Sequence, residues 1–217
     1  MKQKQDLGDL RQSYELDELT DAAKKENPIT LFGQWFTEAT AHPDIVEANA
    51  MSIVTQGVDG YPKARVVLLK HYDAEGFVFY TNYQSQKGQA IAKNECVGLS
   101  FFWPALQRQV IIKGKAEKLA DTVSDAYFNS RPLGSRLGAL ASPQSQPIAD
   151  RSVLEQRLQS LEEMHATTKP KRPIHWGGYL VVPVEIEFWQ GRPNRLHDRL
   201  VFTYTTVQQW TVQRLAP

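Results

Sequence analysis

The order of the hydrophobic patterns along the chain limits the folds that it can adopt. Short apolar runs with turn signals between them fill residues 50–119, helical patterns follow at about 121–166, and further apolar runs fill 178–214. Alternating strands and helices would indicate a parallel sheet, whereas strands grouped on both sides of a helical segment favour an antiparallel one. We therefore predict a mainly β (α+β) fold, an antiparallel barrel or sandwich with helices packed outside it.

Cap and turn residues set the expected boundaries of these elements. Asn27 can cap a first helix with Pro28 at its first position, and an apolar stripe continues to about His42. Further helices are expected at 86–94, 121–128, 134–141 and 150–164, with Ser85, Asp121 and Asp150 as caps. The expected strands are 50–55, 64–71, 77–81, 97–103, 107–119, 178–182, 184–189, 200–205 and 209–214.

The chain length of 217 residues suits one domain with a real core. Residues 1–26 are mixed in charge and weakly periodic, so we predict a mobile N-terminal arm. Residues 27–217 are predicted to form one domain, into which the helices at about 121–166 are inserted.

Composition excludes several classes of protein. The formal net charge is +1, which gives no global bias toward nucleic acid or an anionic membrane, so any anion must be bound by local Arg and Lys clusters. No run approaches the ~18 apolar residues that span a bilayer, and the first twenty residues are polar, so a cytoplasmic protein is expected. The single cysteine, Cys96, excludes an internal disulfide and is expected as a small buried apolar residue.

Several common site motifs are absent from the sequence. No G-x-G-x-x-G follows an expected strand, and there is no P-loop and no G-x-S-x-G elbow. The histidines show no ligand spacing such as H-x-x-x-H, so no metal site is expected.

Lys87 is a first candidate for binding an anion. It falls in the first turn of the helix that Ser85 caps, where free N–H groups and the helix dipole favour negative charge. The alternative is a solvated surface lysine, which base rates favour.

A second candidate cluster is Arg195, His197 and Arg199. In an extended segment these three side chains share one face, since side chains alternate with period two. Two guanidinium groups beside an imidazole suit a phosphorylated ligand. An edge strand that carries charges against aggregation explains the pattern equally well. Trp189, at the end of the preceding strand, is expected in the core on base rates.

Arg65 and Lys70 bracket one expected strand. Their odd separation places them on opposite faces of a regular strand. They can serve one ligand only if a strand end or a bulge redirects one of them.

Taken together and in this order, these segments resemble the pyridoxine/pyridoxamine 5'-phosphate oxidase family. The resemblance runs from about Leu10 to the C-terminus, and its most specific segments are 65–70, 79–82, 108–110, 127–132 and 142–145. The strongest set is C-terminal and comprises 176–178, 187–191, 195–199 and 214–217.

The resemblance implies a homodimer of antiparallel split-barrel subunits, with FMN in clefts at the subunit interface and C-terminal strands that serve dimerisation and the active site. It further implies oxidation of pyridoxine or pyridoxamine 5'-phosphate to pyridoxal 5'-phosphate by hydride transfer to FMN. Dioxygen would reoxidise the flavin and yield hydrogen peroxide, and neither nucleic acid nor membrane would be a partner.

The same resemblance assigns residues to the site. FMN would contact Arg65, Val66, Lys70, Tyr80, Thr81, Gln86, Lys87, Gln109, Gln144, Ser145, Trp189 and Arg199. The substrate would contact Arg11, Tyr14, Lys70, Tyr127, Arg131, Ser135, Arg195 and His197. Lys70, Tyr127, Arg131 and Ser135 would surround its phosphate, and Arg195 and His197 would be the catalytic pair. Gln86 departs from the family, which commonly has an arginine there, so one cationic phosphate contact is expected to be missing.

Two alternative functions are also consistent with parts of this sequence. A split-barrel flavin protein with another substrate, such as a flavin reductase or an F420-type enzyme, would share the flavin residues but not the set Tyr127, Arg131 and Ser135. A non-catalytic protein that stores or senses FMN or pyridoxal phosphate would bind without turnover. Nucleic-acid binding fits least, because no basic stripe with interleaved aromatic residues occurs.

Overall fold

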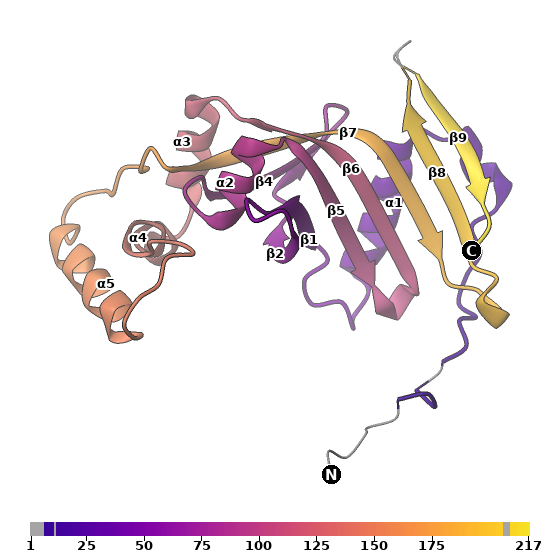
Figure 1. Cartoon of the computed structure of the whole chain (residues 1–217), viewed down its shortest axis with the longest axis horizontal. Helices are drawn as coiled ribbons and strands as arrows, with labels where there is room; N and C mark the ends of the chain where they lie inside the picture. The colour runs from indigo at the N-terminus through magenta and orange to yellow at the C-terminus, as the bar shows by residue number, and fades with distance from the viewer. Residues whose placement is uncertain (1–6, 11, 206–208) are drawn as a thin grey trace. The chain divides into compact units, whose positions relative to one another are not determined.

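The computed structural model describes residues 7–10, 12–205 and 209–217 of the chain. It divides into two compact units, whose helices and strands are labelled in Figure 1. We call Asn49–Ser100 together with Ile112–Val184 the central unit, and the remainder, Met1–Ala48, Phe101–Ile111 and Glu185–Pro217, the terminal unit.

The strands are hydrogen-bonded to one another in a single sheet. The order is β2-β1-β5-β6-β7-β4-β3, with β8 paired to β7 and β9 paired to β8. Each pair with a known register is antiparallel. The bounds are β1 Ala50–Gln56, β2 Pro62–Leu68, β3 His71–Tyr72, β4 Phe77–Asn82, β5 Cys96–Trp103, β6 Arg108–Lys118, β7 Trp176–Gln190, β8 Asp198–Tyr204 and β9 Trp210–Leu215.

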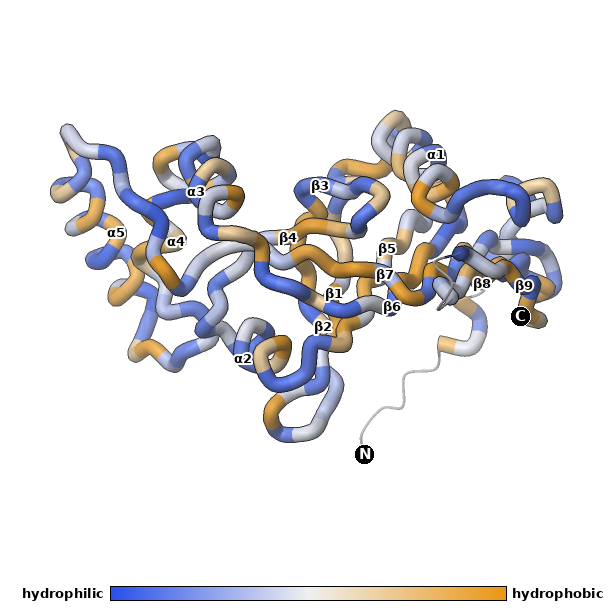
Figure 2. Tube along the Cα trace, turned by 90° about the horizontal axis from the view of Figure 1, so that it is seen from above, coloured by the Kyte–Doolittle hydropathy of each residue, from blue (hydrophilic) through white to orange (hydrophobic). Residues whose placement is uncertain are grey.

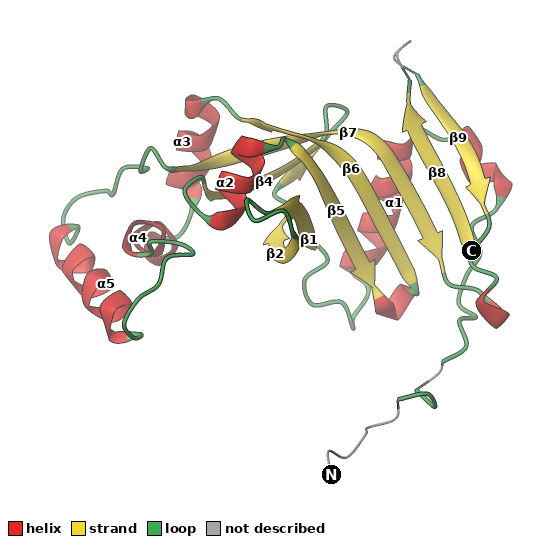
Figure 3. Ribbon diagram, viewed as in Figure 1, coloured by secondary structure: helices red, strands yellow, loops and turns green. Residues whose placement is uncertain are grey.

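Helices are inserted in the chain where the sequence predicts them (Figure 3). The bounds are α1 Pro28–Ala41, α2 Gln86–Lys93, α3 Asp121–Ser130, α4 Leu133–Ala141 and α5 Ser152–Met164, with short 3-10 helices η1 Asp21–Lys25, η2 Pro104–Leu106 and η3 Pro193–Arg195. About as many described residues lie in helices as in strands, so the fold is α+β with an antiparallel sheet.

Local caps account for the helix starts. The side chain of Asn27 accepts a hydrogen bond from the N–H of Ile29, and that of Ser85 accepts one from Gly88, so both predicted caps are confirmed. The cap predicted at Asp121 is wrong, because Ala120 is the N-cap of α3 and Asp121 is its first residue. Asp150 lies one residue before the N-cap of α5 and accepts from the N–H of Ser152 at 2.7 Å.

Two strand predictions are wrong in their bounds. The run expected at 64–71 is two strands, because β2 ends at Leu68 and the chain then bonds elsewhere, through Leu69 N–H to the Asn49 carbonyl and Lys70 N–H to the Val78 carbonyl. The runs expected at 178–182 and 184–189 are a single strand, β7. Pro183 interrupts the sequence pattern but falls between the stretch that pairs with β4 and the stretch that pairs with β8.

The central unit buries an apolar core between its strands and helices. The most buried side chains come from alternate positions of its strands, as period-two burial requires, and include Ile53, Phe77, Phe79, Leu99, Ile112 and Val181. Hydrophobic residues are correspondingly concentrated on β4 and its neighbours (Figure 2). Cys96, in contrast, is exposed at the first position of β5, so its predicted burial is wrong.

The terminal unit has a core of its own, made by aromatic rings. Phe32 of α1 packs edge-on against Phe101 with ring centroids 5.2 Å apart, and Trp35 packs edge-on against Phe188 at the same distance. Trp103 is buried and donates its ring N–H to the Ala48 carbonyl at 3.0 Å.

A buried arginine ties the N-terminal segment to this unit. Arg108 is 6% exposed, lies 4.5 Å from the centroid of the Trp35 ring and donates from Nε to Gln190. Its two terminal nitrogens bind the carboxylates of Asp17 and Glu38. The segment before α1 is thereby fixed to the terminal unit at Asp17.

Within the part of the chain that the structure describes, each helix is too short or too polar to span a lipid bilayer.

Candidate functional site

A cavity of about 620 Å³ opens in the central unit. Polar and aromatic side chains from β4, α2, α3 and α4 line it, together with the segment around the end of β2. Most of the residues that the sequence assigns to the phosphates and the flavin are among them: Val66, Lys70, Tyr80, Thr81, Lys87, Tyr127, Arg131, Ser135 and Gln144. Residues far apart in the sequence therefore line one cavity.

Lys87 is the most enclosed cation of this cavity. It is 8% exposed, and its Nζ donates to Oε1 of Gln144 at 3.3 Å. Burial lowers the pKa of Lys87, and the neighbouring charge of Arg65 lowers that pKa further. The interpretation of Lys87 as a solvated surface lysine is wrong.

Arg65 lies on β2 and is not among the residues that line this cavity, but its charge acts on Lys87. Its Nη1 donates to Oγ1 of Thr55 at 2.8 Å and to the carbonyl of Lys63 at 2.7 Å. Burial lowers the pKa of Arg65. Among the described residues, neither Arg65 nor Lys87 forms an ion pair with a carboxylate. Two partly desolvated cations that repel each other are stabilised when an anion binds between them.

Three stacked rings form one wall of the cavity. The centroids of Tyr80 and Tyr127 are 3.8 Å apart with the planes at 19°, and Tyr80 stacks on Trp176 at 5.5 Å. Burial raises the pKa of Tyr80, as do the neighbouring phenols, and burial also raises the pKa of Tyr127. Both hydroxyl groups therefore remain protonated and can donate hydrogen bonds to an anion.

Arg131 marks a second cationic position on this wall. Its guanidinium lies 4.7 Å from the centroid of the Trp176 ring, and burial lowers its pKa. Nη1 of Arg131 is buried and has no hydrogen-bond partner among the described residues. A buried guanidinium nitrogen without a partner fits an acceptor supplied by a ligand.

Lys70 lies just beyond the end of the strand that carries Arg65. Because β2 ends at Leu68, the alternation of faces stops before Lys70, whose N–H bonds to Val78 of β4 at 2.8 Å. Lys70 lines the cavity beside Val66 and Val67. Lys70 therefore lines the cavity without sharing a regular strand with Arg65, and the binding of one ligand by both residues stays a prediction.

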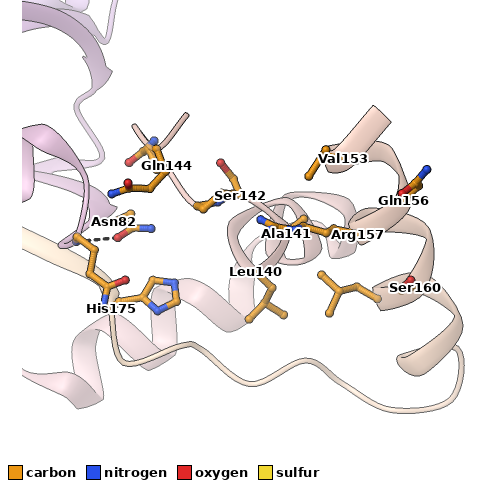
Figure 4. Close-up of a pocket in the computed structure, with 14 residues that line it drawn as sticks. Asn82, Leu140, Ala141, Ser142, Gln144, Val153, Gln156, Arg157, Ser160 and His175 are labelled. Atoms are coloured by element: carbon orange, nitrogen blue, oxygen red, sulfur yellow. Dashed lines mark hydrogen bonds between the residues drawn. The ribbon is translucent and has the colours of Figure 1, made fainter. Parts of the chain in front are cut away.

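The loop 142–146 separates the cavity from a second one. Ser145 adopts a left-handed backbone with φ of 71° inside a turn that the Gln146 N–H and the Pro143 carbonyl close at 2.9 Å. Gln144 and Ser142 line both cavities. The second cavity, also about 620 Å³, extends from this loop to His175 and one face of α5 (Figure 4).

Trp176 and Arg172 are two residues that the sequence analysis did not assign. Arg172 donates to the Trp176 carbonyl at 2.7 Å and also binds the carboxylates of Asp121 and Asp125 on α3. It thus ties the start of β7 to the helix that carries Tyr127. The lysine- and proline-rich loop that holds Arg172 gives no sequence signal of this contact.

The terminal unit holds several of the other predicted residues. The ring of His197 lies 4.7 Å from that of Trp189, and Tyr14 contacts both at 5.8 Å between centroids. Nδ1 of His197 accepts a hydrogen bond from the N–H of Arg192 at 3.1 Å. Partial burial lowers the pKa of His197, and the charge of Arg195 adds to this effect. The neutral ring with its proton on Nε2 is therefore favoured.

The prediction that Arg195, His197 and Arg199 share one face of a strand is wrong. Arg195 ends the 3-10 helix η3 with a φ of 61° and is exposed, whereas Arg199 lies on β8. Nε of Arg199 binds Glu187 at 2.7 Å, and this hydrogen bond raises the pKa of Arg199. Turn geometry after Gly191 breaks the alternation on which the prediction relied.

The remaining predicted residues are placed as follows. Gln109 is half-buried on β6 in the terminal unit, Gln86 is exposed at the first position of α2, and Arg11 lies outside the described residues. Trp189 is half-buried rather than part of the core. No cluster of three metal-ligating side chains occurs among the described residues.

Comparison with known proteins assigns the chain to a family. A sequence profile for pyridoxamine 5'-phosphate oxidase matches residues 38–165, and one for the pyridoxine 5'-phosphate oxidase C-terminal dimerisation region matches 176–217. The chain belongs to this family. The pyridoxine/pyridoxamine 5'-phosphate oxidase of Flavobacterium psychrophilum is 54% identical over 98% of this chain and 99% of its own length. That of Pseudomonas fluorescens is 51% identical with the same coverage.

Solved structures of the family show the predicted split-barrel fold. PhzG from Burkholderia lata, solved with tetrahydrophenazine-1-carboxylic acid, superposes with a TM-score of 0.85 at 27% identity, over 93% of this chain and 99% of that one. A pyridoxamine 5'-phosphate oxidase-related, FMN-binding protein from Nostoc punctiforme gives a TM-score of 0.70 at 15% identity, over 89% of this chain and 100% of that one. The pyridoxamine 5'-phosphate oxidase family binds FMN.

Proposed function

We propose that this chain is an FMN-dependent oxidase that converts pyridoxine or pyridoxamine 5'-phosphate to pyridoxal 5'-phosphate. Relatives more than half identical over nearly the whole chain carry the name of this activity. The observation that carries the proposal is the cavity of the central unit, which holds two cationic positions without carboxylate partners among the described residues. FMN and the substrate each bring one phosphate.

The first cationic position suits the phosphate of FMN. Arg65 and Lys87 are partly desolvated, and the charge of Arg65 acts on Lys87 at the start of α2, where the helix N-terminus adds to the positive potential. Thr81 and Gln144 lie beside Lys87 and can bind further oxygens. Val66, Lys70, Tyr80, Gln86, Gln109, Ser145, Trp189 and Arg199 complete the proposed FMN residues.

The second cationic position suits the substrate phosphate. Arg131 has a free buried nitrogen, and Tyr127 keeps its proton. Ser135 and Lys70 line the same cavity and supply a hydroxyl and an ammonium. Such a set binds a phosphate dianion through several charge-assisted hydrogen bonds.

The catalytic pair is proposed in the terminal unit. With Nδ1 occupied by the Arg192 N–H, His197 presents an Nε2 proton to the oxygen or nitrogen on the substrate's C4' carbon. Arg195 is exposed and free of carboxylate partners among the described residues, so it can orient the substrate. Bound FMN would supply the redox chemistry of the oxidation, with dioxygen as the final electron acceptor. Arg11 and Tyr14 are proposed as substrate contacts of the arm formed by residues 1–26.

We further infer that the enzyme is a homodimer with FMN at the subunit interface. The match of 176–217 to a dimerisation region supports this. In this proposal residues 27–217 form the FMN-binding domain, with C-terminal strands that serve both the dimer contact and the active site.

Steady-state oxidation tests the proposal. Oxygen uptake and pyridoxal 5'-phosphate formation are measured with the two phosphorylated vitamers and with unphosphorylated pyridoxine and pyridoxamine. We expect turnover with the phosphorylated compounds and kcat/KM lower by at least about 100-fold without the phosphate, roughly 2.7 kcal/mol. Flavin binding without turnover would support a storage or sensing role instead. Turnover of tetrahydrophenazine-1-carboxylic acid, which lacks a phosphate, in place of the vitamers would indicate a PhzG-like substrate.

A further inference from the structure

Lys63 lies at the edge of the cationic region without an assigned role. It is exposed on β2, and its Nζ donates to Oε1 of Gln86, the first residue of α2, at 2.5 Å. Among the described residues Lys63 has no carboxylate within ion-pair distance. A lysine ammonium held by an amide rather than by a carboxylate has no neighbouring negative charge to offset it.

The register of β2 aligns this lysine with the proposed phosphate site. Lys63 and Arg65 are two residues apart on a regular strand, so their side chains leave the same face. Lys63 reaches Gln86 while Arg65 acts electrostatically on Lys87, the next residue of the helix. Lys63 and Arg65, neighbours on one face of β2, therefore interact with Gln86 and Lys87, the first two residues of α2.

Gln86 has the chemistry to hold the lysine in place without neutralising it. Its amide oxygen accepts one of the three ammonium protons, and the other two remain available. A carboxylate at position 86 would cancel the charge and repel a phosphate. The N-cap Ser85 fixes the first turn of α2, so the position of Gln86 is itself defined.

We propose that Lys63 is a further binding residue for the phosphate of FMN, positioned by Gln86. The inference rests on the proposed function, since it names one more contact at the same phosphate site. In this role Lys63 supplies the cationic contact that a glutamine at position 86 does not make by itself.

Titration of the apoprotein with FMN and with riboflavin, followed by flavin fluorescence, separates the possibilities. Riboflavin has the same ring system and lacks the phosphate. Lys63→Gln is expected to raise the FMN dissociation constant roughly fivefold to twentyfold at low salt, as a partly exposed charge-assisted contact does. Riboflavin affinity should remain within about twofold of wild type, because no phosphate contact is lost.

Two further variants define the role of the lysine. Lys93→Gln removes an exposed lysine from the last turn of the same helix and should leave FMN affinity within about twofold. Gln86→Arg in the Lys63→Gln background should restore most of the FMN affinity, because the new guanidinium replaces the charge at the same helix start.

The outcomes are distinguishable. An FMN dissociation constant within twofold of wild type in Lys63→Gln, or an equal loss for riboflavin, would overturn the assignment of Lys63 while leaving the oxidase proposal intact. Failure of the wild-type protein to bind FMN at all would overturn the proposed function and this inference with it.

Discussion

The guanidinium of Arg131 lies 4.7 Å from the centroid of the Trp176 ring, with its Nη1 buried and without a hydrogen-bond partner among the described residues. The indole face fixes the plane of the guanidinium and leaves one edge for a ligand. A planar guanidinium held in one orientation recognises a phosphate by paired hydrogen bonds, which a lysine ammonium cannot reproduce.

Arg131→Lys is therefore expected to weaken substrate binding although the charge is kept. KM for pyridoxine 5'-phosphate should rise about tenfold or more, corresponding to roughly 1.5–3 kcal/mol for charge-assisted hydrogen bonds. FMN content should be unchanged, because Arg131 is assigned to the other phosphate. Arg151→Lys, at an exposed position before α5, is the matched control. A loss of FMN together with an unaltered KM would contradict the assignment.

Arg172 is expected to stabilise the wall of the cavity. Its side chain is 7% exposed and joins α3 to the start of β7, but its partners Asp121 and Asp125 are largely exposed and water screens their charges. Arg172→Ala should lower the free energy of unfolding in urea by about 1–3 kcal/mol. Arg151→Ala, which breaks an exposed pair with Glu155, should change it by less than about 0.5 kcal/mol. Equal effects of the two variants would show that Arg172 has no special role.

The lowered pKa of Lys87 predicts how FMN binding depends on pH. Burial and the charge of Arg65 lower its pKa below the ordinary 10.5 in the free protein, whereas a bound phosphate dianion would raise that pKa again. Binding then requires the protonated lysine, so FMN affinity should fall as pH rises through the lowered pKa. The dissociation constant is measured between about pH 7 and pH 10. Lys87→Arg, which stays charged, should flatten the dependence. A dependence that persists unchanged in Lys87→Arg would exclude this lysine as its origin.

The lowered pKa of His197 predicts how kcat/KM changes on the acid side of the pH profile. Its pKa is lowered from 6.5 by partial burial and by Arg195, and protonation would place a hydrogen on Nδ1 against the Arg192 N–H. The neutral form is present above the lowered pKa, so kcat/KM should fall only at pH below about 6.5. His197→Asn should reduce kcat/KM and abolish this limb. An acid limb that is retained in the variant would have to come from another group.

Much of the fold could be predicted from the sequence because its signals are local. The caps Asn27 and Ser85 fixed two helix starts, and the grouping of strands around an inserted helical segment gave the antiparallel class. The continuity of β7 through Pro183 could not be predicted, because the proline falls where β7 changes its partner from β4 to β8 and its missing N–H interrupts neither pairing. Nothing in the local sequence reports that change.

The candidate site could be predicted only in part. The family resemblance predicts contacts to phosphate or FMN for Lys70, Lys87 and Arg131, and the structure brings all three to one cavity. The burial of Lys87 was not predictable, because exposure is the default for lysine and only tertiary packing removes it. The stack of Tyr80, Tyr127 and Trp176 joins residues from three elements. Contacts of that kind leave no periodicity in the sequence.

The most direct test of the oxidase proposal is a visible spectrum of the purified protein during anaerobic addition of pyridoxamine 5'-phosphate. We predict flavin absorbance bands that bleach on addition of this substrate and return when air is admitted, with formation of hydrogen peroxide and pyridoxal 5'-phosphate. Bound flavin that stays oxidised in the presence of pyridoxine and pyridoxamine 5'-phosphate, or a protein that takes up no added FMN, would contradict the proposal.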